Sequence, residues 1–158
     1  MSVIVTKSTE ETQKIAFELA KDILNKPHEE GSALVLALDG VLGAGKTTFT
    51  QGFADGLSIT EVVTSPTFLI LKEYNIVQSL KSKVKSNDKT FTKFYHIDCY
   101  RLKDENDIED IGLHEVLKNP ENIVLIEWAG NIKKSLPKEY IKIKFYYISE
   151  NKRKISIM

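Results

Sequence analysis

Residues 40–47 read GVLGAGKT, and this stretch decides the fold. It fits the phosphate-binding pattern of a glycine, four free positions, a second glycine, a lysine, and a serine or threonine. Residues 33–38, immediately before it, form an apolar run of buried-strand length, and the residues after Lys46 have helical spacing. A strand, a glycine-rich loop and a helix are what a phosphate-binding loop (P-loop) needs, so a bound nucleotide is the first expectation.

The chemistry of this loop assigns roles to its residues. Glycines permit positive φ angles, so that successive N–H groups can surround phosphate oxygens, and the following helix adds its positive end. Lys46 is expected to reach the β- and γ-phosphates, and the Thr47 hydroxyl to take one place in a Mg²⁺ shell. A glycine-rich turn without a ligand is disfavoured by this Lys-Thr pair. The residues expected to bind nucleotide here are Gly43, Ala44, Gly45, Lys46, Thr47 and Thr48.

The composition indicates a single globular domain over residues 1–158, with 42% apolar residues. The 22 basic and 22 acidic side chains cancel, so no overall field draws the chain to DNA or to a membrane, although a local basic patch stays open. A lone cysteine, Cys99, excludes an internal disulfide and suits a reducing compartment. Residues 1–11 lack an apolar signal core, and no run approaches the ~18 apolar residues of a membrane helix. These features predict a cytoplasmic protein.

Hydrophobic periodicity and turn residues predict the order of the remaining elements. Residues 78–90, rich in Lys, Ser and Asn, are expected to form a solvated hairpin tip, with an RNA or partner contact as the less favoured reading. Residues 131–137 are expected to be a connector. Strands are predicted at 3–5, 33–38, 68–76, 91–97, 123–127, 141–148 and 154–158, and helices from 8 to near 27, at 46–56 and at about 104–117.

Two carboxylates stand at the ends of predicted strands. Glu127 closes an apolar run and has the form of the acidic element that holds Mg²⁺, directly or through water, beside a P-loop. Asp98 could orient an attacking water, bind a magnesium water, or form a structural ion pair with Arg101. Trp128 is interpreted as a core aromatic. The carboxylates and the loop together predict a metal-assisted phosphate site.

Other polar residues carry weaker signals. Residues 64–67, which read TSPT, could form a segment that senses the γ-phosphate, or only a polar turn. The histidines share no ligand spacing and are interpreted as structural or surface residues without a metal role. They are His28, His96 and His114.

These pieces, in this order, resemble the TsaE family (also called YjeE), the small P-loop ATPases of bacterial tRNA threonylcarbamoyladenosine synthesis. The resemblance spans nearly the whole chain, and it is carried by motifs well beyond the P-loop. The matching segments are Glu11-Thr12, 40–48 (GVLGAGKTT), 64–68 (TSPTF), 96–101 (HIDCYR) and 126–128 (IEW).

The resemblance implies a P-loop NTPase-like three-layer α/β fold, with a central mixed sheet and helices on both faces. It also implies a Mg²⁺-dependent ATPase that binds ATP or ADP, is weak alone, and acts with the TsaB and TsaD proteins, which bring it to tRNA indirectly. By the same resemblance Lys46 contacts phosphate, Thr47 and Glu127 serve Mg²⁺, and Asp98 supports hydrolysis. Lys46, Asp98 and Glu127 are thus the catalytic candidates. Thr12 lies where the family's N-terminal segment approaches the nucleotide.

The chain departs from the family at Val41, where an acidic residue is usual. Backbone binding of phosphate does not need that side chain, so nucleotide binding is expected to survive while turnover is expected to be slow. Three other functions stay open. A GTPase would need an Asn-Lys-x-Asp motif, which the chain lacks, and a small-molecule kinase normally uses several arginines, whereas this chain has Arg101 and Arg153. A nucleotide-gated assembly subunit with little turnover is the third.

Overall fold

The computed structural model describes residues 2–26, 31–66, 70–77, 91–102 and 111–158. Within those ranges, no helix is long and apolar enough to cross a membrane. The strands are β1 (Ser2–Thr6), β2 (Leu34–Asp39), β3 (Leu71–Asn75), β4 (Lys93–Asp98), β5 (Asn122–Glu127), β6 (Ile141–Ser149) and β7 (Lys152–Ile157). The helices are α1 (Thr9–Leu24), α2 (Lys46–Gly56), α4 (Leu113–Lys118) and the 3-10 helix η1 (Ala129–Ser135).

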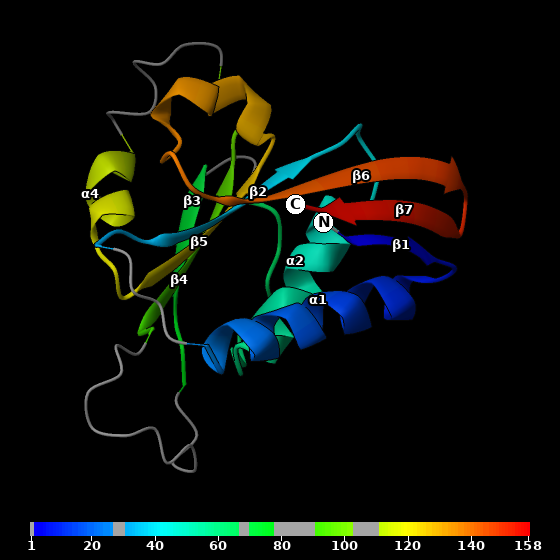
Figure 1. Ribbon diagram of the computed structural model, residues 1–158, viewed down its shortest axis with the longest axis horizontal. Helices are drawn as coiled ribbons and strands as arrows, with labels where there is room; N and C mark the ends of the chain where they lie inside the picture. Colours follow the sequence, from blue (N-terminus) through cyan, green and yellow to red (C-terminus); the bar gives the residue numbers. More distant parts are fainter. Residues whose placement is uncertain (1, 27–30, 67–69, 78–90, 103–110) are drawn as a thin grey trace.

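The strands form one mixed sheet in the order β1-β7-β6-β2-β5-β4-β3 (Figure 1). The central strand β2 pairs in parallel with β5 and β6, and β5 pairs in parallel with β4. The outer pairings, of β3 with β4 and of β1 and β6 with β7, are antiparallel. Because parallel strands end at the same edge, the carboxyl ends of β2, β4 and β5 lie together, and that edge carries the site described below.

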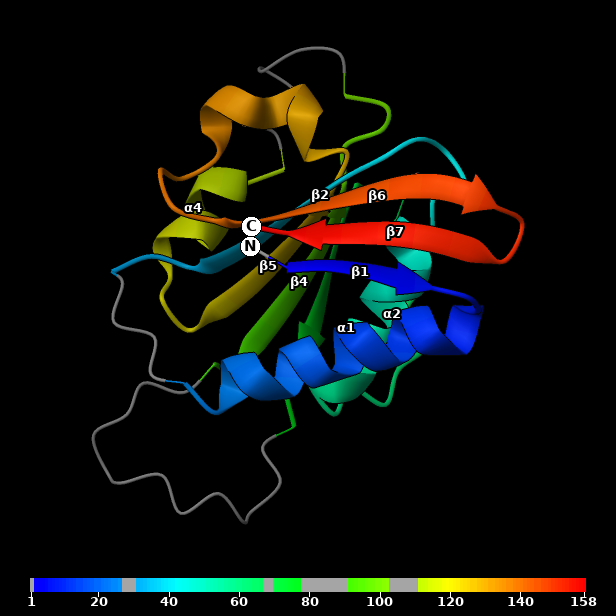
Figure 2. The same cartoon turned by 45° about the vertical axis from the view of Figure 1, so that its right-hand side comes forward.

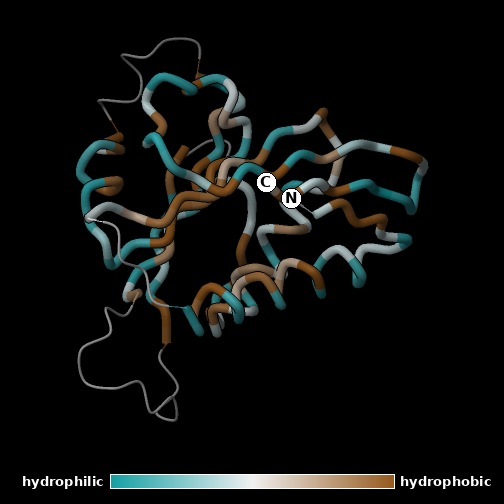
Figure 3. The backbone as a smooth tube through the Cα atoms, in the orientation of Figure 1, coloured by the Kyte–Doolittle hydropathy of each residue, from teal (hydrophilic) through white to brown (hydrophobic). Residues whose placement is uncertain are grey.

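Helices cover both faces of the sheet, which gives the three layers that the sequence resemblance implied. On one face α1 and α2 lie side by side (Figure 2), and on the other lie α4 and η1. The buried run of β2 serves both layers, because Leu36 and Leu38 point into the first and Val35 and Ala37 into the second. Hydrophobic residues are accordingly concentrated in the central strands (Figure 3).

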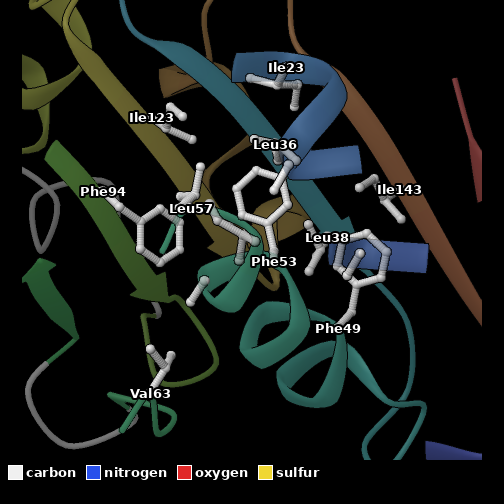
Figure 4. Close-up of a cluster of buried hydrophobic side chains, with 14 of the residues drawn as sticks. Ile23, Leu36, Leu38, Phe49, Phe53, Leu57, Val63, Phe94, Ile123 and Ile143 are labelled. Carbon is white, nitrogen blue, oxygen red and sulfur yellow. The ribbon is translucent and has the colours of Figure 1, made fainter. Parts of the chain in front are cut away.

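The core beneath α1 and α2 is built around two phenylalanines four residues apart on α2 (Figure 4). Phe49 and Phe53 are fully buried, as expected for residues four apart on the inward face of a helix. Phe49 meets the ring of Phe145 edge to face with the centroids 5.4 Å apart. This packing fixes the helix that carries the P-loop residues onto the sheet.

The start of α1 follows the capping rules. The Ser8 side chain accepts a hydrogen bond from the Glu11 N–H at 3.1 Å, and acidic residues occupy the first turn. The hydroxyl of Thr12 then lies inward, 2.9 Å from that of Thr6 on β1. The first helix and first strand are thereby joined near the position at which the sequence places the nucleotide.

Several predicted boundaries were wrong, and others fall outside the described residues. Of the helix expected at 104–117, residues 104–110 lie outside the described part of the chain; within that part α4 begins at Leu113, after Gly112 with its left-handed φ of 68°. Residues 131–137 are not a plain connector, since η1 occupies most of them, and β7 begins two residues before its predicted start. The hairpin tip at 78–90 and the residues His28, Thr67 and Phe68 lie outside the described part of the chain.

Candidate functional site

The P-loop connects the carboxyl end of β2 to the amino end of α2. Gly43 and Gly45 have φ angles of 74° and 97°, in the left-handed region that a side chain disfavours. Gly45 is also the residue that precedes the helix, so the first N–H groups of α2 have no capping side chain and remain free to bind an anion. The local conformation is therefore the one that the glycine spacing predicts.

The side chain of Lys46 is folded into the loop. Its Nζ donates hydrogen bonds to the carbonyl oxygens of Gly40 at 2.7 Å and Val41 at 3.1 Å. The same Nζ lies 3.9 Å from the centroid of the Trp128 ring, within cation–π range. Burial lowers the pKa of Lys46, and the nearby carboxylates of Glu127, Asp98 and Asp39 oppose that shift. The ammonium is thus enclosed at the mouth of the loop.

Glu127 ends the central strand β5 with its side chain almost entirely buried beneath the start of α2. Its Oε2 accepts a hydrogen bond from the Thr47 hydroxyl at 3.1 Å. Its Oε1 is 2.9 Å from Nε2 of His96 and accepts a second, longer bond from the Thr50 hydroxyl at 3.3 Å. The two residues expected to serve Mg²⁺, Thr47 and Glu127, are therefore in direct contact.

Asp98 ends β4 and lies opposite Glu127 in the parallel β4–β5 pair. It is buried, and its Oδ2 accepts a hydrogen bond of 2.5 Å from the Ser65 hydroxyl. Its Oδ1 accepts from the Tyr100 N–H at 2.9 Å. The contact with Ser65 joins the hydroxyl-rich segment 64–67 to the second carboxylate, an arrangement that the sequence left open.

Trp128 does more than fill the core. Its backbone is left-handed, with φ 58°, and its N–H donates to the carbonyl of Leu38 at 3.0 Å, which anchors it between β2 and β5. The side chain packs on the core beneath η1, and its ring lies under Lys46 and contacts the ring of Tyr100, with the centroids 5.0 Å apart and the ring planes tilted by 50°. The interpretation of Trp128 as only a core aromatic was incomplete.

A small cleft of about 40 Å³ opens beside the P-loop. Thr12, Gly45 and Thr48 line it, so three of the predicted nucleotide-binding residues come together there, although the Thr12 hydroxyl is already bonded to Thr6 and to the Ser8 carbonyl. Its other lining residues are Ser8, Thr9, Glu150, Asn151 and Arg153.

Arg153 also lines the cleft, although no sequence motif indicates that it belongs to the site. It lies on β7, more than a hundred residues along the chain from the loop, yet its Nε is 3.7 Å from where a Cβ on Gly45 would be. Its NH1 donates to the carbonyls of Ser149, Glu150 and Lys152 across the β6–β7 turn. The only available signal was the scarcity of arginine in the chain.

The donor atoms of the site suit Mg²⁺. They are a hydroxyl and two carboxylates, the hard oxygen ligands that Mg²⁺ prefers. No group of three or more His, Cys, Asp or Glu side chains is arranged to hold a metal in the part of the chain that the structure describes. A cation here would therefore take most of its ligands from water and phosphate, as Mg²⁺ does at nucleotide sites.

Comparison with known proteins identifies the family. The family model "Threonylcarbamoyl adenosine biosynthesis protein TsaE" matches residues 6–155. The chain belongs to the TsaE family. A tRNA threonylcarbamoyladenosine biosynthesis protein TsaE from Bacillus subtilis is 41% identical over 151 residues, covering 96% of this chain and 81% of the relative. The TsaE protein of Aquifex aeolicus is 35% identical, covering 98% and 93% respectively.

A solved structure agrees with the family assignment. The crystal structure of Bacillus subtilis YdiB superposes with a TM-score of 0.69 at 33% identity, covering 99% of this chain and 83% of that one. The resemblance to the TsaE family and the P-loop NTPase-like α/β fold that the sequence predicts are both confirmed.

Proposed function

We propose that this protein is the ATP-binding and ATP-hydrolysing subunit required for threonylcarbamoyladenosine modification of tRNA, at the adenosine next to the anticodon. Membership of the TsaE family supports an ATP-binding P-loop protein in this pathway. ATP hydrolysis is inferred from one observation. Lys46, Thr47 and Glu127 lie together at one edge of the sheet, with Asp98 on the adjacent strand.

Each residue of the site has its own role in nucleotide binding or hydrolysis. The loop N–H groups and the amino end of α2 bind the phosphates, and Lys46 exchanges a carbonyl partner for a phosphate oxygen. Thr47 and Glu127 hold Mg²⁺, which when bound neutralises charge on the transferring phosphate. Asp98, fixed by Ser65, orients the attacking water. The cleft lined by Thr12 and Thr48 is too small to enclose a nucleoside, so the nucleoside end of ATP or ADP would lie across its mouth.

The partners in this proposal are the TsaB and TsaD proteins, and tRNA is reached through them. In that complex the group transfer takes place on TsaD, and hydrolysis by this subunit resets the complex between turnovers. In this role the protein acts in the cytoplasm, where its partners bind the tRNA.

Phosphate release with and without purified TsaB and TsaD tests the proposal, and Lys46→Ala serves as the blank. We expect slow release alone and a clear increase with the partners, and a loss of at least about 100-fold in Lys46→Ala because the charge facing the phosphates is gone. Phosphate transferred to an acceptor instead of appearing free would favour a small-molecule kinase.

Val41 provides a second test of turnover. Its side chain is 62% exposed on the P-loop, where relatives of the family usually carry an acid. Val41→Asp is expected to raise the rate of ATP hydrolysis by about tenfold or more, if that carboxylate assists proton transfer. The matched control is Leu42→Asp, which adds the same charge at a neighbouring position that is 76% exposed. Equal rates in wild type and Val41→Asp would contradict the slow-turnover hypothesis.

Val41 also supports an alternative, a nucleotide-gated assembly subunit whose occupancy matters more than its turnover. That function predicts partner binding that depends on nucleotide even when Asp98→Asn has abolished hydrolysis. Partner affinity that is the same with and without nucleotide would exclude it.

A further inference from the structure

His96 lies in a position where the sheet would normally present an apolar side chain. It is the middle residue of the alternating set Phe94, His96 and Asp98 on β4, which faces α2. Phe94 belongs to the core, Asp98 reaches the site, and His96 between them is 0% exposed. A buried imidazole in such a row is costly unless it has a specific partner.

The partner of His96 is the carboxylate of Glu127. Nε2 lies 2.9 Å from Oε1, and because a carboxylate oxygen can only accept, Nε2 carries the proton and donates it. Nδ1 is buried with no hydrogen-bond partner among the described residues. The ring is therefore held by one strong contact, and that contact is to a residue of the site.

The contact divides the Glu127 carboxylate into two halves. Oε1 is occupied by His96 and by the weaker bond from Thr50, whereas Oε2 faces the Thr47 hydroxyl. With Oε1 held, the carboxylate cannot rotate freely about its last bond, and Oε2 stays directed at the amino end of α2. Hydrogen bonds of this kind commonly orient metal-binding groups.

We propose that His96 is a positioning residue, which orients Glu127 so that the carboxylate and Thr47 together receive Mg²⁺. The inference rests on the proposed function, because it assumes that the site binds a Mg²⁺–nucleotide complex. His96 itself touches neither metal nor phosphate in this role. This role differs from the interpretation of His96 as a structural or surface residue without a metal role.

A purely structural role is less consistent with the geometry. If His96 only filled the layer, an apolar side chain of similar size would do so without leaving Nδ1 unbonded. Removing the imidazole takes the shorter hydrogen bond from the buried Glu127 carboxylate and so lowers stability, but the variant should still fold and its main defect should be in the response to Mg²⁺. A purely structural role predicts that an apolar variant responds to Mg²⁺ like wild type, whereas the positioning role predicts a weaker response.

The test compares His96→Leu, which removes the donor, with His96→Gln, whose amide N–H can replace Nε2. The exposed His114 on α4 provides the matched control His114→Leu. ADP affinity is measured by calorimetry with and without Mg²⁺, and the emission of Trp128, the single tryptophan of the chain, is followed in a Mg²⁺ titration. Thermal unfolding of each variant reports on the fold.

We expect His96→Leu to reduce the factor by which Mg²⁺ strengthens ADP binding by about 10- to 100-fold. ADP affinity without Mg²⁺ should stay within about twofold of wild type. His96→Gln should recover most of the loss. Unchanged Mg²⁺ dependence in His96→Leu would overturn the proposal, as would an equal loss of affinity with and without Mg²⁺ in both variants. A wild type that ignores Mg²⁺ would overturn it too, by removing the proposed function on which it rests.

Discussion

Glu127→Gln is expected to lower Mg²⁺-dependent ATP hydrolysis by on the order of 100-fold or more, while ADP binding without Mg²⁺ is retained. The substitution keeps the size of the side chain and one oxygen that can accept from His96, while the amide N–H can donate to the Thr47 hydroxyl oxygen, but it removes the negative charge that Mg²⁺ requires. The loss should be larger than that of His96→Leu, since Glu127 is the group through which His96 acts.

The stability of the Glu127→Gln variant separates chemistry from folding. The carboxylate is buried, and a buried charge without its cation costs free energy, so replacing it with an amide should leave the melting temperature in EDTA unchanged or raised. Glu115→Gln is the matched control, because that side chain is 81% exposed and pairs with Lys118 at 3.5 Å on the helix surface. A Glu127→Gln protein that hydrolyses ATP at the wild-type rate would remove Glu127 from the site.

The network around Glu127 also explains why some variants of the P-loop should be difficult to interpret alone. Lys46 lies near both carboxylates and on the ring of Trp128, and burial lowers its pKa while those carboxylates oppose the change. Removing any one member changes the electrostatic environment of the others. Double-variant cycles are therefore the appropriate way to assign the coupling between Lys46 and Glu127.

The parts of the fold that local sequence encodes could be predicted from it. The run 33–38, the loop 40–47 and the helix after Lys46 were recognisable because strand, glycine loop and helix are determined by neighbours in sequence. The cap at Ser8 belongs to the same class. The helix expected at 104–117 is not continuous through Gly112, whose left-handed backbone directly precedes α4.

The parts of the site that depend on strand order could not be predicted in this way. His96 and Glu127 meet only because β4 and β5 are parallel neighbours, and nothing in the spacing of the histidines indicates that pairing. Arg153 approaches the P-loop only because β6 pairs with β2 and β7, which carries Arg153, pairs with β6. Ser65 was noted as a possible sensor, but its contact with Asp98 required the fold.

The second large effect is expected at the contact of α1 with α2. A Cβ added to Gly52 would lie 2.2 Å from the carbonyl oxygen of Gln13 and 2.5 Å from its Cα, and these are backbone atoms that cannot rotate away. Gly56, the last residue of α2, makes a similar approach, since a Cβ there would lie 2.6 Å from the Cβ of Ala20. The two helices therefore touch along a seam of small residues.

Gly52→Ala is expected to lower the free energy of unfolding by about 2 kcal/mol or more. Alanine would add about 1 kcal/mol of intrinsic helix stability at this position, but overpacking of a filled contact costs about 1–3 kcal/mol and more when backbone must move. The clash is severe enough for the second effect to exceed the first. In a chain of this length the loss corresponds to roughly 4–8 °C in melting temperature, measured by urea and thermal unfolding.

Gly31→Ala is the matched control, because no atom of the described residues, its chain neighbours aside, lies within 4 Å of a Cβ at that position, and its stability should stay within about 0.5 kcal/mol of wild type. The seam also links stability to the site, since α1 carries Thr12 and α2 carries Lys46 and Thr48. A shift of α1 away from α2 would widen the cleft between those residues, so the folded Gly52→Ala protein should bind ADP more weakly as well. Wild-type stability and ADP affinity in Gly52→Ala would mean that the two helices are not held at this distance.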